Sequence, residues 1–243
     1  IRGFTSLAEK MTPREVVEFL NRYFTDIVQV VSNHNGMVDK FMGDAVMVLF
    51  GAPLPMGDDP HRAALCALEM KRIAETLNAE LGESGNHRLE IGVGLNTGPV
   101  IAGNIGSQHR MEYTVIGDNV NLASRMEGLN KFYGTKILVS ESTRNAVGDQ
   151  ATFREIDYVR VKGKTKPVAI FELMEEPSLL IDRYEEALHL YRDRKFEDAL
   201  NIFVSIADEF DDPPSRIFKD RCLRFIESPP ESGWDRVFIA GTK

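Results

Sequence analysis

Hydrophobic residues recur every three or four positions between residues 12 and 34, which is the spacing of one face of an α-helix. Thr12 is followed by proline and, three positions on, by Glu15, so the helix start has the form of a capping box with proline in the first turn. Asn35–Gly36 marks the end of this helix. We therefore expect an amphipathic helix whose apolar face carries Val16, Leu20, Tyr23, Ile27 and Val31.

Shorter apolar runs and further helical patterns continue to residue 174. A tight hairpin at Met42–Gly43 is expected to join the first two strands. Strands are expected near residues 37–42, 45–50, 88–97, 99–104, 110–116, 136–140, 153–161 and 168–174. Helices are expected over residues 59–81 and 118–130, with a short one starting at Ser140. Helices mixed with antiparallel hairpins predict an α+β sandwich.

The pattern becomes purely helical after residue 178. YEEALHLYRDRKFEDALNIFVSIADEF predicts two amphipathic helices with a turn near Arg194–Lys195, and PPSRIFKDRCLRFIESPP predicts a third. The first pair is similar to a single tetratricopeptide repeat. One repeat cannot bury its apolar face alone, so we expect the tail, residues 178–228, to dock on residues 1–175, on a second copy or on a partner protein. Residues 229–243 form a C-terminal extension, and a plain helical appendage and a binding module both remain open.

Composition narrows the class of protein. With 243 residues, 43% hydrophobic and 27% charged, the chain is typical of a soluble globular protein. No apolar stretch approaches the roughly 18 residues of a membrane helix. Cys66 and Cys222 lie far apart and give no disulfide framework, so a reducing, cytoplasmic setting is expected. The net charge of −8 argues against nucleic acid as a partner.

Two segments carry candidate chemistry. In DKFMGDAVMVLF, Asp44 lies at the mouth of an otherwise apolar strand; a carboxylate in such a place is usually just part of a hairpin turn. In EYTVIGDNVNLASRMEGL, Asn121 and Arg125 are four residues apart, hence on one face of a helix, and Thr114 lies on the strand before it. The pair either projects into a cleft or is solvated.

A third segment, VRVKGKTKPV, gathers the lysines at 162, 164 and 166. It is either a phosphate clamp or a solvated turn. Neither spacing nor composition distinguishes the two interpretations.

Taken together, these segments resemble the catalytic domain of the class III nucleotidyl cyclases, the adenylate and guanylate cyclases. IRGFT and KFMGDAVMVLFG resemble the two metal motifs, EYTVIGDNVNLASRM the segment that contacts base and ribose, and VKGKTKPV the phosphate-lysine segment. The similarity runs in order from residue 1 to about 174. It implies a class III cyclase sandwich with a ferredoxin-like βαββαβ core and a mostly antiparallel sheet, followed by a small all-α tail.

The resemblance assigns roles to particular residues. Asp44 and the backbone of Ile1 would bind two Mg²⁺ ions, for which Mn²⁺ would substitute, and a second metal-binding aspartate is expected directly before Ile1. Arg125 would stabilise charge in the transition state and Asn121 would orient the ribose. Lys162, with Lys164 the less favoured choice, would hold the outer phosphates.

Base recognition would fall to Lys40 and Thr114, a pair that implies ATP and the subgroup in which threonine replaces the more usual aspartate. The expected reaction converts ATP to 3′,5′-cyclic AMP and pyrophosphate in a homodimer with two shared sites. A catalytically silent nucleotide-binding regulatory domain, a guanylate cyclase and an interaction protein acting through its helical tail are the alternatives. A membrane anchor upstream of Ile1 stays open, and bicarbonate activation is only a weak option.

Overall fold

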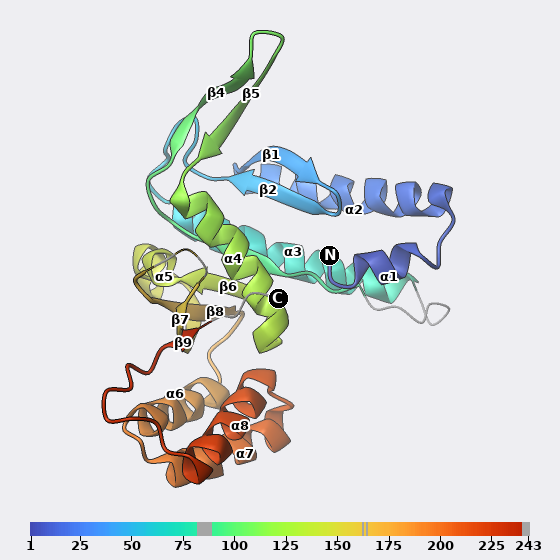
Figure 1. Ribbon diagram of the computed structural model, residues 1–243. Helices are drawn as coiled ribbons and strands as arrows, with labels where there is room; N and C mark the ends of the chain where they lie inside the picture. Colours follow the sequence, from blue (N-terminus) through green and yellow to red (C-terminus); the bar gives the residue numbers. More distant parts are fainter. Residues whose placement is uncertain (82–88, 162, 164, 240–243) are drawn as a thin grey trace.

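The computed structural model describes residues 1–81, 89–161, 163 and 165–239 (Figure 1). In chain order the first half comprises α1 Phe4–Ala8, α2 Pro13–Asn33, β1 Met37–Met42, β2 Ala45–Leu49, α3 Asp59–Leu81, β3 Val93–Leu95, β4 Ile101–Ser107 and β5 Arg110–Ile116. The second half comprises α4 Asp118–Tyr133, β6 Ile137–Ser140, α5 Glu141–Val147, η1 Gly148–Gln150, β7 Thr152–Arg160, β8 Val168–Met174, α6 Leu179–Arg192, α7 Phe196–Phe210, α8 Pro213–Glu227 and β9 Phe238–Ile239. No helix in these ranges is both long and apolar enough to cross a bilayer.

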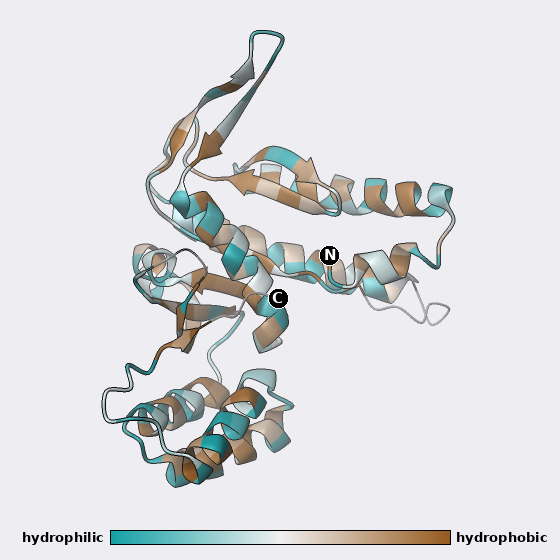
Figure 2. Ribbon diagram, in the orientation of Figure 1, coloured by the Kyte–Doolittle hydropathy of each residue, from teal (hydrophilic) through white to brown (hydrophobic). Residues whose placement is uncertain are grey.

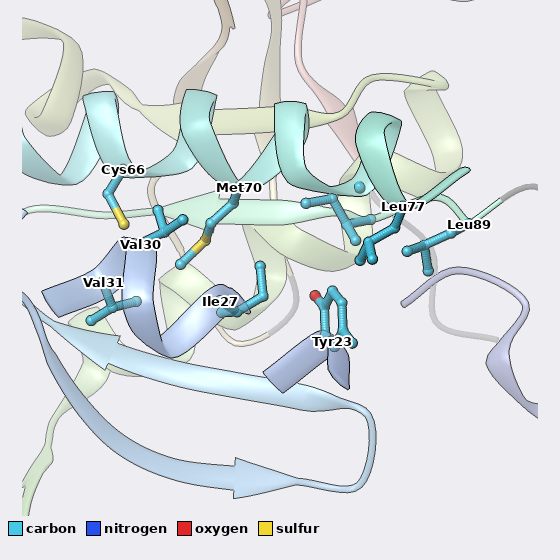
Figure 3. Close-up of a cluster of buried hydrophobic side chains, with 10 residues drawn as sticks. Tyr23, Ile27, Val30, Val31, Cys66, Met70, Leu77 and Leu89 are labelled. Carbon is cyan, nitrogen blue, oxygen red and sulfur yellow. The ribbon is translucent and has the colours of Figure 1, made fainter. Parts of the chain in front are cut away.

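Helices α2 and α3 pack against each other through their apolar faces (Figure 3). The predicted capping box is present: the Thr12 hydroxyl accepts a hydrogen bond from the Glu15 backbone N–H, and the Glu15 side chain accepts one from Thr12. The buried side of α2 carries Tyr23 and Ile27, which meet Met70 of α3. Val38, Val46 and Val48 of β1 and β2 pack against the same cluster, which joins the strand pair to these helices.

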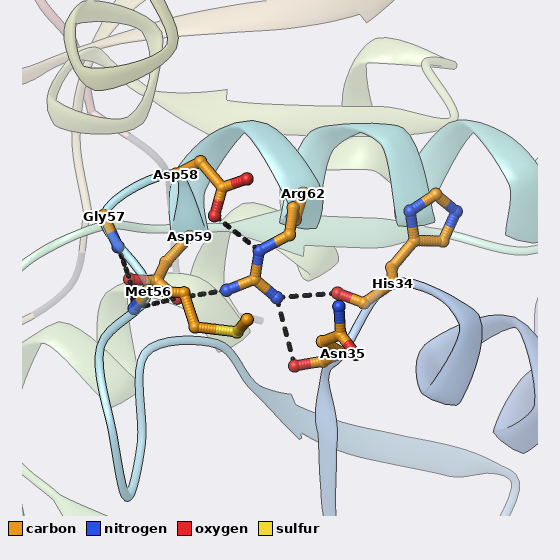
Figure 4. Close-up of polar contacts among 7 residues, drawn as sticks. All are labelled: His34, Asn35, Met56, Gly57, Asp58, Asp59 and Arg62. Atoms are coloured by element: carbon orange, nitrogen blue, oxygen red, sulfur yellow. Dashed lines mark hydrogen bonds and ion pairs between the residues drawn. The ribbon is translucent and has the colours of Figure 1, made fainter.

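Arg62, near the start of α3, ties the strand pair to the helices (Figure 4). Its guanidinium donates hydrogen bonds to the backbone carbonyls of His34 and Asn35, at 2.7 and 3.1 Å. It also pairs with the carboxylates of Asp58 and Asp59. The end of α2, the loop before α3 and the approach to β1 are thereby held at one point.

A five-stranded sheet in the order β3-β6-β8-β7-β9 forms the second layer. Its β6–β8 and β7–β8 pairs are antiparallel, whereas β3–β6 and β7–β9 are parallel. Helix α4 lies directly on β3, because a Cβ at Gly94 would come within 2.3 Å of the α4 backbone. This close packing explains why position 94 is a glycine, and it fixes the position of the helix that carries Asn121 and Arg125. Counting all three sheets of the described residues, four of the six strand pairs are antiparallel, and the expected α+β sandwich is confirmed.

The β4–β5 hairpin projects from the rest of the molecule (Figure 1). Brown, apolar segments lie on both of its strands toward the base (Figure 2). Ile101 is 67% exposed and Met111 62% exposed. These large apolar side chains are therefore open to solvent on the projecting hairpin.

The three helices of the tail lie where the sequence pattern predicts them. They share one core, in which Tyr184, Phe203 and Phe218 are fully buried. The tail docks on residues 1–175: the Tyr184 hydroxyl donates to the Ile156 carbonyl at 3.1 Å, and Asp212 pairs with Arg154 at 2.9 Å. The sequence left open whether the tail docks on residues 1–175, on a second copy or on a partner protein; the structure shows it docked on residues 1–175.

Strand boundaries differ from expectation in two places. The strand expected over 88–97 is only three residues long, Val93–Leu95, within the described residues, and β4 extends to Ser107 rather than 104. The turn between β1 and β2 is formed by Gly43 and Asp44, one position later than expected, with Gly43 at a positive φ of 65°. Asp44 therefore lies in the turn itself.

Candidate active site

The turn between β1 and β2 brings Asp44 to the beginning of the chain. The Asp44 Oδ2 atom lies 2.9 Å from the backbone nitrogen of Ile1, and the Asp44 side chain is 29% exposed. Arg2 holds this first segment against residues 89–92, because its backbone N–H donates to the Glu90 carbonyl at 2.7 Å. The two predicted metal-binding residues are thus neighbours in the fold.

Tyr23 on α2 lies close enough to interact with the Asp44 carboxylate. Burial raises the pKa of Tyr23 to about 12, and the Asp44 carboxylate adds to this shift. The phenol therefore stays neutral at physiological pH and does not compete for a cation. A carboxylate in this position favours a positively charged ligand.

These residues fit a divalent cation. Among the described residues no three acidic, histidine or cysteine side chains gather into a complete cage. However, Mg²⁺ is usually bound through one or two carboxylates together with substrate phosphates, so a single exposed carboxylate with neighbouring backbone is a suitable partial site. The main chain of Ile1 lies beside the Asp44 carboxylate, so side-chain and backbone atoms meet at this position.

A second group of residues joins β1 to β5. The Thr114 hydroxyl donates a hydrogen bond to Asp39 Oδ2 at 2.9 Å. The Lys40 ammonium lies 3.6 Å from the same oxygen and 3.7 Å from Glu112 Oε2. Lys40 and Thr114, which the sequence predicts to act together, are therefore linked through one carboxylate.

Asp39 is the residue that the sequence interpretation missed. The pairing of β1 with β2 skips from Val38↔Val48 to Lys40↔Met47, so Asp39 is the extra residue of a β-bulge. A bulge redirects side chains locally and often lies next to a functional site. Two charged residues in succession within an apolar strand break the strict alternation of faces, and this was the available signal.

Glu112 supplies the second carboxylate beside Lys40. The neighbouring Arg110 holds the pKa of Glu112 below its ordinary value, and Lys40 contributes to this effect. Glu112 therefore stays ionised. The Lys40 ammonium lies between two negative charges, one buried and one exposed.

Helix α4 carries the third group. Asn121 is exposed in its first turn, and Arg125 follows one turn later and is half-buried. Arg125 Nη1 is buried without a hydrogen-bond partner among the described atoms. A buried donor of this kind is costly unless it meets an acceptor. An incoming anion would provide that acceptor.

The segment expected to carry the phosphate lysines passes beside Arg125. Gly163 adopts a positive φ of 79°, and a Cβ there would lie 3.2 Å from Arg125 Nη2. The backbone thus approaches the guanidinium at a position that favours glycine. Lys162 and Lys164 lie outside the described residues.

The comparison with known families decides the class of protein. The adenylate and guanylate cyclase catalytic domain matches residues 1–175. The chain belongs to this family. Cyclases of this class generally use a divalent metal ion, bind a nucleotide substrate and typically dimerise.

Both substrate types occur among the similar proteins. The chain is 35% identical to a terminal-differentiation-specific adenylate cyclase of Dictyostelium discoideum over 94% of its own length and 11% of that protein. It is similar to the solved guanylyl cyclase Cya2, with 40% identity, a TM-score of 0.67 and coverage of 74% of this chain and 90% of that one. The adenylyl cyclase CyaB from P. aeruginosa matches with 33% identity, the same TM-score and coverage of 72% and 90%.

The curated relatives are much longer than this chain, which spans 11% to 35% of the length of the first three. The Dictyostelium match extends past residue 175 and thus into the helical tail. The likeness is therefore not confined to the cyclase domain.

Proposed function

We propose that residues 1–175 form the catalytic domain of an adenylate cyclase, which converts ATP to 3′,5′-cyclic AMP and pyrophosphate. The observation that carries this choice is the contact of both Lys40 and Thr114 with Asp39. Lys40 can only donate hydrogen bonds, which suits N1 of adenine. The Thr114 oxygen can accept one from the adenine amino group.

Guanine presents the opposite pattern at the same two positions. Its N1 carries a hydrogen and its six-position is a carbonyl, so Lys40 would face a donor and Thr114 would have to donate. A site built around hydrogen bonds to its substrate can reject the wrong one by about 10⁴-fold. Lys40 and Thr114 support the assignment of the chain to the lysine/threonine subgroup of the family.

The chemistry at phosphorus is assigned to α4 and the loop beside it. Arg125 would stabilise the negative charge that develops on the α-phosphate, and its unpartnered Nη1 is available for this role. Asn121, one turn earlier on the same face, would hold the ribose so that its 3′-hydroxyl attacks in line. Lys162 would bind the β- and γ-phosphates.

Asp44 and the backbone of Ile1 would hold the metal ions, two Mg²⁺ per site, with Mn²⁺ as a substitute. When bound, these ions supply the Lewis acidity that lowers the pKa of the ribose hydroxyl and neutralises phosphate charge. A second aspartate directly before Ile1 remains our expectation. The Asp44 carboxylate lies in the turn between β1 and β2.

We further propose a homodimer with two shared sites. Asp44 and Ile1 of one protomer would face the base, ribose and phosphate residues of the other. The exposed apolar side chains of the β4–β5 hairpin, such as Ile101 and Met111, support an interface there. A lone protomer would then lack turnover.

The division of the chain is also proposed: the catalytic domain over 1–175, a tetratricopeptide-like tail over 178–228 and an extension over 229–243. The tail would serve intracellular signalling by binding a partner protein or by coupling to the cyclase domain on which it docks. A cytoplasmic setting agrees with two free, buried cysteines, Cys66 and Cys222.

A product assay tests the proposal. The chain, together with its natural upstream residues, is incubated with ATP or GTP and Mg²⁺ or Mn²⁺, and cyclic product and nucleotide binding are measured. Cyclic AMP formed from ATP is the expected result. Cyclic GMP formed from GTP would instead indicate a guanylate cyclase, and ATP binding without turnover would indicate a silent regulatory domain.

A further inference from the structure

Asp39 is well placed to act on the base-reading pair. Its side chain is 1% exposed, and it lies at the bulge of β1, where an extra residue shifts the register against β2. Oδ2 accepts the hydrogen bond from Thr114 and faces the Lys40 ammonium, while Oδ1 is buried with no partner among the described atoms. A buried carboxylate with spare accepting capacity is expensive to keep for packing alone.

The direction of the Thr114 hydrogen bond is chemically important. A threonine hydroxyl has one hydrogen to donate and two lone pairs that accept. An ionised carboxylate only accepts, so the Thr114 hydrogen is committed to Asp39. The Thr114 oxygen can then act toward a ligand as an acceptor and not as a donor.

We propose that Asp39 is a specificity-determining positioning residue: it orients the Thr114 hydroxyl so that the site accepts the amino group of adenine and refuses the carbonyl of guanine. This inference rests on the proposed adenylate cyclase function. Threonine alone is compatible with either base, because a free hydroxyl can rotate to donate or to accept. The buried carboxylate removes that choice before the nucleotide arrives.

The same carboxylate orients Lys40. Its ammonium is attracted to Asp39 at 3.6 Å from one side and to Glu112 at 3.7 Å from the other. A long, flexible lysine side chain is thereby kept beside Thr114. The donor and the acceptor for adenine are held by one buried group.

Asp39→Asn tests the proposal because it preserves shape and removes only the obligatory acceptor. The new amide can donate to Thr114, which frees the hydroxyl hydrogen for the guanine carbonyl. We expect the ratio of kcat/KM for ATP to kcat/KM for GTP to fall roughly 10- to 100-fold. Asp39→Ala, which supplies neither donor nor acceptor, should lower the same ratio.

Glu112→Gln is the matched control, since it removes the other charge beside Lys40 without touching the Thr114 hydrogen. For Glu112→Gln, the ratio of kcat/KM for ATP to kcat/KM for GTP should stay within about twofold of the wild-type ratio, even if KM changes for both nucleotides. In a Thr114→Val background, Asp39→Asn should lower the ratio much less than it does in the wild type, because the hydroxyl is gone and only the contact of Asp39 with Lys40 remains.

The outcomes separate the inference from the function on which it rests. If the wild type makes cyclic AMP but Asp39→Asn lowers turnover of both nucleotides equally, Asp39 is merely structural and the inference is overturned. The same holds if Glu112→Gln shifts the ratio as much as Asp39→Asn does. If the wild type shows no preference for ATP over GTP, the proposed adenylate cyclase function is wrong, whatever the Asp39 variants do.

Discussion

Arg221→Met should weaken the docking of the tail on the helix that carries Asn121 and Arg125 and so lower the free energy of unfolding. Arg221 on α8 is 7% exposed and donates to Asp157 of β7 at 2.6 Å, while the Tyr133 hydroxyl, at the end of α4, donates to the same carboxylate oxygen at 2.6 Å. Burial acts to lower the pKa of Arg221, but Asp157 and Tyr133 outweigh it and raise that pKa above its ordinary value. The three elements therefore meet at one buried ion pair.

The loss can be estimated from these contacts. Removing one partner of a buried ion pair costs about 3–5 kcal/mol, because the other charge is left uncompensated. Tyr133 and the Tyr158 backbone N–H still donate to Asp157, which favours the lower end of this range. The guanidinium also lies 4.2 Å from the ring centre of Phe238, a contact worth roughly 0.5–2 kcal/mol. We expect a loss of about 4 kcal/mol in the free energy of unfolding.

Denaturant unfolding followed by circular dichroism measures this loss. The control is Arg183→Met, since Arg183 pairs with Glu209, whose side chain is 52% exposed, and a surface pair is worth at most about 1 kcal/mol. If Arg221→Met costs no more than Arg183→Met, the buried pair does not hold the tail and the reasoning is wrong.

Three further predictions concern the site, the interface and pH. Arg125→Ala should lower kcat roughly 100-fold. Mixing it with Asp44→Ala should restore up to about a quarter of wild-type activity, because about half of all dimers are then heterodimers and each heterodimer carries one intact site of two; no recovery would contradict shared sites. Ile101→Asp, at a 67% exposed position, should shift the protein to monomers in analytical ultracentrifugation without loss of fold. Burial raises the pKa of the Cys66 and Cys222 thiols to about 12. Their contribution to the free energy of unfolding is therefore complete below pH 9 and is lost between pH 9 and 12, where the unfolded chain releases these protons and the folded protein keeps them. Replacing both cysteines with alanine should make the free energy of unfolding decline less steeply over this range.

Local signals in the sequence predicted local structure well. The start of α2 follows from a capping box formed by neighbouring residues, and the turn between α6 and α7 follows from a break in helical periodicity. The resemblance of ordered motifs predicted the family, which is confirmed for residues 1–175. Such features need only a few adjacent positions to be recognised.

Contacts between residues far apart in the chain could not be predicted from the sequence. Arg154 and Asp212 are 58 positions apart, and nothing local in either segment indicates that they pair. The bulge at Asp39 likewise depends on the register between two strands, which periodicity alone does not give. The site residues were assigned by motif, and the carboxylate that joins two of them emerged only when β1 and β5 were seen together.

A crystal structure with a non-reactive ATP analogue and Mg²⁺ tests the central claim most directly. We predict that adenine N1 lies about 3 Å from Lys40 Nζ and its amino group about 3 Å from Thr114 Oγ1, with the hydroxyl still bonded to Asp39. Metal density should lie beside Asp44. A base bound away from Lys40 and Thr114, or a triphosphate lodged far from Asp44 and Arg125, would contradict the account.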